Sequence, residues 1–191
     1  MLWKARFARG QEWCSDDTFD PQPARGLPDG QKGFRMINVV LFEPEIPQNT
    51  GNIARTCACT GARLHLVEPL GFRLTQKYLA RAGMDYWDDV EVVRHACTRD
   101  FLAAHAADEL WFYTGHASRL HTDVDLSDAG QEIYLVFGRE SRGIDPDILH
   151  EHEGRCVRLP MVPGMRSLNL SNAAAIAVYD ALRQQGFPGL A

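Results

Sequence analysis

The sequence predicts an α/β fold with a mostly parallel β-sheet flanked by helices, and three observations support this. Apolar runs such as INVVLF (37–42) and IYLVF (133–137) are continuous rather than alternating, as expected for strands buried on both faces. Stretches with helical character separate the runs, which favours parallel pairing through crossover connections. The 191 residues, 45% of them hydrophobic, are typical of one soluble globular domain.

Residues 1–35 differ from the rest of the chain. They hold three prolines, show no apolar periodicity, and interrupt each basic cluster with acids. This composition predicts a disordered extension over 1–35, followed by one folded domain over 36–191. The extension lacks the apolar core of a secretory signal, and no stretch has the ~20 apolar residues of a membrane helix. We therefore expect a cytoplasmic protein without a membrane partner.

In the first half of the domain, the strand over 37–42 leads into a loop with two prolines, which are excluded from central strands. Thr50 or Asn49 is expected to cap a helix that runs to about Thr60, where Gly61 ends it. Three further elements are expected before residue 95: a strand over 64–67, a helical stretch over 78–82 and a short strand over 90–93.

In the second half, Thr98 and Asp100 are expected to open a helix that ends before a strand over 110–114. The buried strand over 133–137 then leads directly into Gly138. A last strand over 156–159 precedes a Pro- and Gly-containing loop and a helix from about Asn169 to Gln185.

The cysteine and histidine pattern does not favour a metal centre. The five cysteines are scattered and odd in number, which indicates reduced thiols. Cys57 and Cys59 lie two apart in a predicted helix and point in different directions, so we expect buried, unreactive thiols. His150 and His152 have no second ligand pair nearby at zinc-site spacing. We therefore expect no metal.

The formal net charge of −5 argues against binding nucleic acid through bulk charge. We expect no DNA partner, and an RNA partner would have to be held by a local, shaped site.

Three loops, 47–55, 138–144 and 159–172, follow predicted strands at the edge where open α/β sheets bind ligands. None carries a dinucleotide or P-loop phosphate motif, and no G-x-S-x-G elbow is present. They offer arginines, which suit phosphate groups, with amides, hydroxyls and the single acid Glu140. Each asparagine could equally be a helix cap, and each arginine an ordinary surface cation. Together, the loops indicate a nucleotide-related site.

The three loops resemble the three motifs of the SPOUT methyltransferases, in their SpoU branch. Asn49 and Arg55 match the first motif, Gly138, Glu140, Gly143 and Ile144 the second, and LPM (159–161) with SLNLSN (167–172) the third. The segments VLFEPEIPQNTGNIART and LPMVPGMRSLNLSNA are similar to the minimal, TrmL-type members. The resemblance extends from Met36 to the end of the chain. Arg139 departs from it, because the family usually has proline there.

The resemblance implies a trefoil knot formed by the last strand, its loop and the final helix, and a homodimer with its active site at the interface. It also implies methyl transfer from S-adenosyl-L-methionine to a ribose 2′-hydroxyl in the tRNA anticodon stem-loop. The implied target is the wobble nucleotide, cytidine or 5-carboxymethylaminomethyluridine, of tRNA(Leu)-type substrates. The implied cofactor contacts are Tyr113, Thr114, Gly115, Gly138, Leu159, Met161, Ser167 and Leu168.

By the same resemblance, Arg55 has the activating role, and Asn49, Glu140, Ser167 and Asn169 hold it and the ribose in place. Arginine is a poor proton acceptor because its pKa exceeds ~12. We therefore favour Arg55 as the group that stabilises the developing alkoxide and orients a phosphate, with the proton lost to phosphate, water or a transiently neutral guanidine. Two alternatives stay open: a knotted dimer that binds RNA or an assembly partner without turnover, and methylation of a different RNA.

Overall fold

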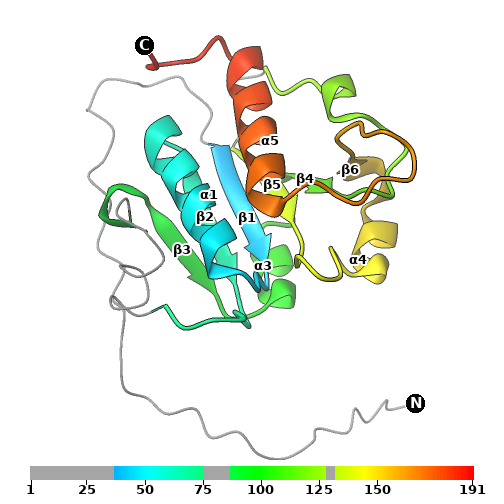
Figure 1. Ribbon diagram of the computed structural model, residues 1–191, viewed down its shortest axis with the longest axis horizontal. Helices are drawn as coiled ribbons and strands as arrows, with labels where there is room; N and C mark the ends of the chain where they lie inside the picture. The colour runs from blue at the N-terminus through cyan, green and yellow to red at the C-terminus, as the bar shows by residue number, and fades with distance from the viewer. Residues whose placement is uncertain (1–36, 75–86, 128–131) are drawn as a thin grey trace, which may run out of the picture.

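The computed structural model describes residues 37–74, 87–127 and 132–191 (Figure 1). The predicted extension over 1–35 and the helical stretch over 78–82 lie outside these residues. The described strands form one six-stranded parallel sheet in the order β3-β2-β1-β5-β4-β6, which confirms the predicted fold class. The strands are β1 (Ile37–Phe42), β2 (Arg63–Val67), β3 (Val92–His95), β4 (Glu109–Tyr113), β5 (Ile133–Phe137) and β6 (Cys156–Val157).

Helices cover both faces of the sheet (Figure 1). They are α1 (Pro47–Thr60), α3 (Thr98–Ala104), α4 (Pro146–Glu151) and α5 (Leu170–Gln184), with short 3₁₀ turns η1 (Trp87–Asp89), η2 (His121–Asp123) and η3 (Glu153–Arg155). Among the residues described, none of these helices has the length and apolar character needed to cross a bilayer.

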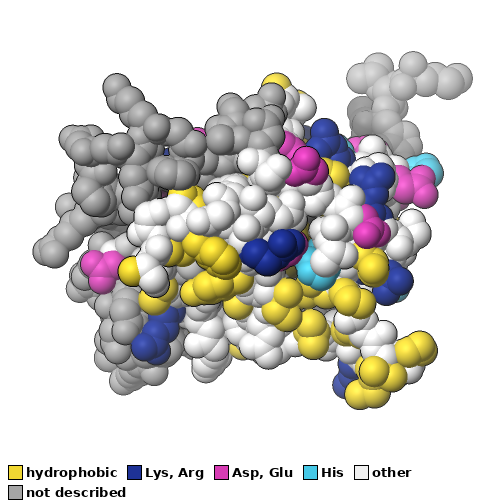
Figure 2. Space-filling model, turned by 90° about the horizontal axis from the view of Figure 1, so that it is seen from above, with side chains coloured by type: hydrophobic (Ala, Val, Ile, Leu, Met, Phe, Trp, Pro, Cys, Tyr) yellow, Lys and Arg dark blue, Asp and Glu magenta, His cyan; other side chains and the backbone are white. Residues whose placement is uncertain are grey.

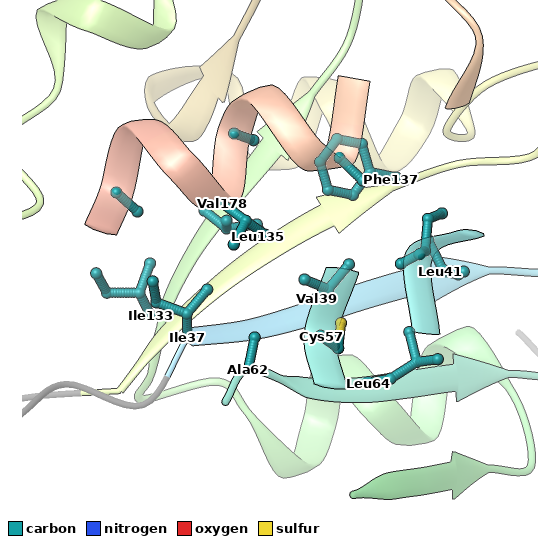
Figure 3. Packing of buried hydrophobic residues seen from close by; sticks show 14 of the residues in the cluster. Ile37, Val39, Leu41, Cys57, Ala62, Leu64, Ile133, Leu135, Phe137 and Val178 are labelled. Carbon is teal, nitrogen blue, oxygen red and sulfur yellow. The ribbon is translucent and has the colours of Figure 1, made fainter. Parts of the chain in front are cut away.

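Alternate residues of β1 point to opposite faces of the sheet and serve two apolar cores. Val39 and Leu41 pack with α1 and α5 (Figure 3). Val40 and Phe42 pack on the other face with Phe101 of α3. Burial on both faces explains why every residue of this strand except the buried Asn38 is apolar.

The start of α1 differs from the prediction. The helix begins at Pro47, its N-cap residue is Ile46, and that residue supplies no side-chain cap. Asn49 and Thr50, expected as caps, are instead buried inside the helix. The end is as predicted, since Gly61 adopts φ 71° and donates its N–H to the Cys57 carbonyl oxygen.

Other element boundaries follow the sheet rather than the local sequence. β3 lies two residues later than predicted, where it pairs with β2. β6 is only two residues long, because after Val157 the chain makes just an isolated bridge between Arg158 and Leu120. The short helix α4 was not predicted; Asp145 caps it by accepting the Asp147 N–H at 2.9 Å.

The cysteine prediction is partly wrong. Cys57 is buried, and burial raises the pKa of its thiol to about 12, so it is unreactive as expected. Cys59 is exposed, because each residue of an α-helix turns by ~100° and the second one along faces away from the core. All four cysteines in the described part of the chain are free thiols.

The return of the chain from β6 to α5 positions the third motif. β6 is at one edge of the sheet, yet α5 packs on α1, β5 and β1 near its centre (Figure 1). The connecting loop, 158–169, therefore passes the carboxyl ends of the intervening strands. This path brings all three motif loops to the same edge of the sheet.

Candidate active site

A pocket of about 650 Å³ opens at the carboxyl ends of β4 and β5. Its walls come from the segments after these strands, 113–116 and 137–144, from parts of the loop 159–169, and from Ile46 and Asn49 at the start of α1. Tyr113 and Phe137, the last residues of β4 and β5, stack with ring centroids 4.9 Å apart. The pocket thus lies where a parallel sheet is expected to bind a ligand.

Most of the predicted site residues meet in this pocket. Every predicted cofactor contact lines it: Tyr113, Thr114, Gly115, Gly138, Leu159, Met161, Ser167 and Leu168. Four predicted catalytic residues also line it: Asn49, Glu140, Ser167 and Asn169. Arg55 does not. It is exposed on the stripe of α1 that also carries Asn52 and Cys59.

Gly138 allows the chain to approach itself very closely at the edge of the pocket. A Cβ atom on Gly138 would lie 2.1 Å from the carbonyl carbon of Gly143 and 2.3 Å from the nitrogen of Ile144. The loop is closed by two backbone hydrogen bonds, from the Arg139 N–H to the Gly143 oxygen at 3.1 Å and in the reverse direction at 2.8 Å. Gly143 adopts φ +72°. Glycine at both positions is therefore required for this turn.

The Glu140 carboxylate caps the entrance to α1. It accepts the backbone N–H groups of Glu45 at 2.8 Å and Ile46 at 3.2 Å, and the side-chain amide of Asn49 at 3.0 Å. A helix N-terminus has unpaired N–H groups and a partial positive charge, so it favours a carboxylate. The capping group is thus more than 90 residues away along the chain, which explains why the local cap prediction was wrong.

A directional chain of hydrogen bonds joins the three motif loops. Because a carboxylate only accepts, the Asn49 amide nitrogen must face Glu140, and its Oδ1 accepts Asn169 Nδ2 at 2.9 Å. Asn169 Oδ1 in turn accepts the Ser171 N–H at 2.9 Å and its Oγ–H at 2.7 Å, which caps α5. These contacts fix the relative position of the loops.

Two acidic residues directly after β1, Glu43 and Glu45, make further contacts with the 138–144 loop. The sequence analysis did not predict them. Glu45 accepts the N–H and Oγ–H of Ser141 at 2.9 and 2.8 Å, and Glu43 pairs with Arg139. Arg139 also donates its backbone N–H within the 138–144 loop, which the family's usual proline could not do. The available signal was the position of both acids at the carboxyl end of a buried strand.

Glu140→Gln is expected to lower the free energy of unfolding by about 1–3 kcal/mol, because an amide group presents a donor where the carboxylate accepts. Urea denaturation measures the change. The matched control is Glu153→Gln in η3, an exposed glutamate whose replacement should be neutral within ~0.5 kcal/mol. Equal stability of the two variants would contradict the capping role of Glu140.

Comparison with known proteins agrees with this geometry. The model of the SpoU rRNA Methylase family matches residues 36–179. A tRNA (cytidine(34)-2′-O)-methyltransferase from Saccharophagus degradans is 50% identical over 155 residues, which cover 81% of this chain and 99% of the relative. A structure solved for insights into the 2-OH methylation of C/U34 on tRNA has a TM-score of 0.72 and 38% identity, over 80% of this chain and 97% of that one.

An rRNA methyltransferase from Sinorhizobium meliloti, solved with S-adenosylmethionine (AdoMet) bound, is more distant. Its TM-score is 0.69 at 26% identity, over 85% of this chain and 61% of that chain. Motif residues, parallel sheet and family match agree with one another. The chain described here therefore belongs to the SpoU methylase family.

Proposed function

We propose that the protein is a cytoplasmic tRNA methyltransferase that transfers a methyl group from S-adenosylmethionine to the ribose 2′-hydroxyl of the wobble nucleotide. The target is cytidine or a modified uridine at position 34 of the anticodon stem-loop. The observation that carries the proposal is the meeting of the three motif loops at one pocket, where Asn169 donates a hydrogen bond to Asn49 and Asn49 donates one to Glu140. The Saccharophagus relative at 50% identity supports the choice of nucleotide.

The pocket suits S-adenosylmethionine in size and in chemistry. Its volume of about 650 Å³ lies within the ~300–1,000 Å³ usual for small-molecule sites. Leu159, Met161 and Leu168 offer apolar surface for the adenine ring, and the sharp turn at Gly138 lets backbone groups approach the ligand. Bound there, the cofactor supplies an electrophilic methyl group on a sulfonium.

The protein's own contribution is to align the ribose and to stabilise charge as the 2′-oxygen bonds to the methyl carbon, while the methyl–sulfur bond breaks and S-adenosylhomocysteine leaves. In our proposal the Arg55 guanidinium faces the developing alkoxide and an adjacent phosphate. The hydroxyl proton passes to phosphate, water or a transiently neutral guanidine. The chain Glu140–Asn49–Asn169 acts by positioning, because both Glu140 oxygens already accept hydrogen bonds.

A homodimer would complete such a site. Arg55 lies outside the pocket of its own chain, so a second copy or the bound RNA must bring it to a methyl group.

Apolar side chains gather along one side of the molecule (Figure 2). Large exposed apolar residues include Ile176 and Tyr179, one helical turn apart on α5. We therefore propose that α5 contributes to the dimer interface, together with the C-terminal knot that the family implies.

Ile176→Glu is expected to convert the dimer to a monomer, because a buried, unpaired carboxylate is strongly unfavourable at an apolar interface. Light scattering should then give a mass near 21.4 kDa instead of twice that value. The control is His150→Glu, which adds a carboxylate at an exposed position of α4 and should leave the dimer intact. A wild-type protein that is monomeric and fully active would refute the dimer.

The activity is tested directly with an anticodon stem-loop, S-adenosylmethionine and the protein, followed by mass spectrometry of the nucleosides. We expect a 2′-O-methylated nucleoside at position 34, and none from a stem-loop that carries a 2′-deoxynucleotide there. tRNA from cells with and without the gene should differ at the same nucleoside. Binding of RNA and cofactor without transfer would favour the non-catalytic dimer, and methylation only of ribosomal RNA would favour a different substrate.

A further inference from the structure

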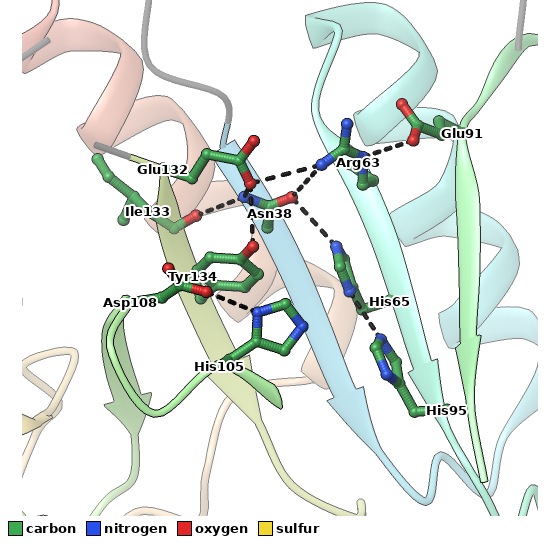
Figure 4. Close-up of polar contacts among 10 residues, drawn as sticks. All are labelled: Asn38, Arg63, His65, Glu91, His95, His105, Asp108, Glu132, Ile133 and Tyr134. Carbon is green, nitrogen blue, oxygen red and sulfur yellow. Dashed lines mark hydrogen bonds and ion pairs between the residues drawn. The ribbon is translucent and has the colours of Figure 1, made fainter. Parts of the chain in front are cut away.

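Three histidines that are far apart in the sequence meet on the face of the sheet opposite α1 and α5 (Figure 4). His65 belongs to β2, His95 ends β3, and His105 follows α3. One ring nitrogen of each lies within 4.8 Å of the others. His65 is only 3% exposed, and the other two are half-buried. We call this group the histidine cluster.

The hydrogen bonds of His65 fix which of its nitrogens can bind a ligand. Asn38 donates its amide to Glu132 and to the Ile133 carbonyl oxygen, both at 3.2 Å, so its Oδ1 must be the atom that faces His65 Nε2 at 3.1 Å. His65 therefore carries its proton on Nε2. Its Nδ1 presents a lone pair toward His95 Nε2, at 2.9 Å.

His105 is oriented in the same manner by a carboxylate. Its Nδ1 donates to Asp108 Oδ2 at 2.7 Å, so Nε2 is the nitrogen left to bind a ligand. Histidines that bind metals almost always donate their second N–H to a carboxylate or carbonyl oxygen, which sets the tautomer and the ring orientation. Two of the three histidines in the cluster thus already have this outer partner.

We propose that the histidine cluster is a Zn²⁺ site with three imidazole ligands and a water molecule in the fourth position. Zn–N bonds of ~2.0–2.1 Å in a tetrahedral site place the nitrogens ~3.3 Å apart. The present separations, from 2.9 Å to at most 4.8 Å, bracket this value, so modest ring movements suffice. Three nitrogen ligands favour zinc over Mg²⁺ and Ca²⁺, which prefer oxygen.

Aromatic side chains enclose one side of the histidine cluster. The rings of Phe101 and Tyr134 pack edge-on against His65 and form an apolar wall. Apolar walls of this kind limit the access of water to a metal.

The proposed metal lies apart from the methyl-transfer pocket. It would tie β2 and β3 to the turn between α3 and β4, and none of its histidines lines the methyl-transfer pocket. The proposal is therefore independent of the proposed enzymatic activity and compatible with methyl transfer that needs no metal.

Titration of the metal-stripped full chain with ZnCl₂ in a calorimeter tests the site. We expect one equivalent to bind. His95→Gln and His105→Gln should each weaken binding by more than ~100-fold, beyond the ~10–100-fold cost of losing an outer partner. The control, His150→Gln on α4, removes an exposed histidine and should bind as the wild type does. Absence of stoichiometric binding to the wild type, or equal binding by all variants, would overturn the proposal.

Two further measurements do not depend on the folding of these variants. Asp108→Asn keeps all three ligands and should weaken zinc binding by ~10–100-fold. Co²⁺ in place of zinc should give the visible spectrum of a tetrahedral nitrogen site without a thiolate charge-transfer band. Thiolate absorption that disappears in Cys59→Ser would assign the metal to a cysteine and overturn the proposal.

Discussion

Gly138→Ala is expected to abolish S-adenosylmethionine binding and to lower the free energy of unfolding by about 3 kcal/mol or more. Overpacking a well-filled site usually costs ~1–3 kcal/mol, because side chains and backbone can shift. Here the new methyl group would lie 2.1 Å from a backbone carbon of the same loop, which has no flexible end that could move aside. The 138–144 loop must therefore open, and with it one wall of the pocket.

Calorimetry with the cofactor and urea denaturation on the same sample separate the two effects. The matched control is Gly154→Ala in η3, where an added Cβ meets no atom within 4 Å and the backbone imposes no left-handed φ. That variant should bind and fold as the wild type does. Normal cofactor affinity in Gly138→Ala would show that the close approach does not shape the pocket.

The strands could be predicted because a strand buried on both faces has apolar residues at nearly all consecutive positions. Apart from Asn38, β1 and β5 are continuous apolar runs, and their predicted ranges match the structure. The sequence of α4 has no comparable pattern, because the helix has no buried residue and therefore no apolar periodicity. The start of α1 was misplaced because its cap is the distant Glu140 carboxylate rather than a neighbouring side chain.

The site, like the fold, could be predicted only in part from the sequence. A general property of parallel sheets places the three loops at one edge, so their proximity could be inferred from the order of elements. The hydrogen bonds that Asn49 donates to Glu140 and that Asn169 donates to Asn49 depend on side-chain geometry across more than 90 residues of chain. The histidine cluster is harder still to predict, since ligands separated by 30 and 10 residues match no local metal motif and meet only through the sheet register.

Arg55→Ala is expected to reduce methyl transfer by ~10²–10⁴-fold, the usual loss when a charge-stabilising group is removed. The affinity for S-adenosylmethionine should stay within a few-fold of the wild type, because Arg55 does not line the cofactor pocket. Arg55→Lys should also lose methyl transfer, since an ammonium group cannot hold the hydroxyl and the phosphate with a planar pair of donors. Single-turnover methylation of an anticodon stem-loop, with calorimetry of cofactor binding, measures both quantities.

The competing explanation is that Arg55 only stabilises α1 through an exposed ion pair, which is worth ~0–1 kcal/mol. Arg55→Ala would then lower the melting temperature slightly and leave turnover nearly unchanged. Arg99→Ala is the matched control for such a role, because Arg99 is an exposed arginine paired with Asp100 on α3. If Arg55→Ala behaves like Arg99→Ala in single turnover, Arg55 does not act on the ribose. If Arg55→Ala loses methyl transfer but keeps cofactor affinity and stability, the Arg55 guanidinium acts on the RNA. Arg55 then reaches the active site from outside the pocket of its own chain.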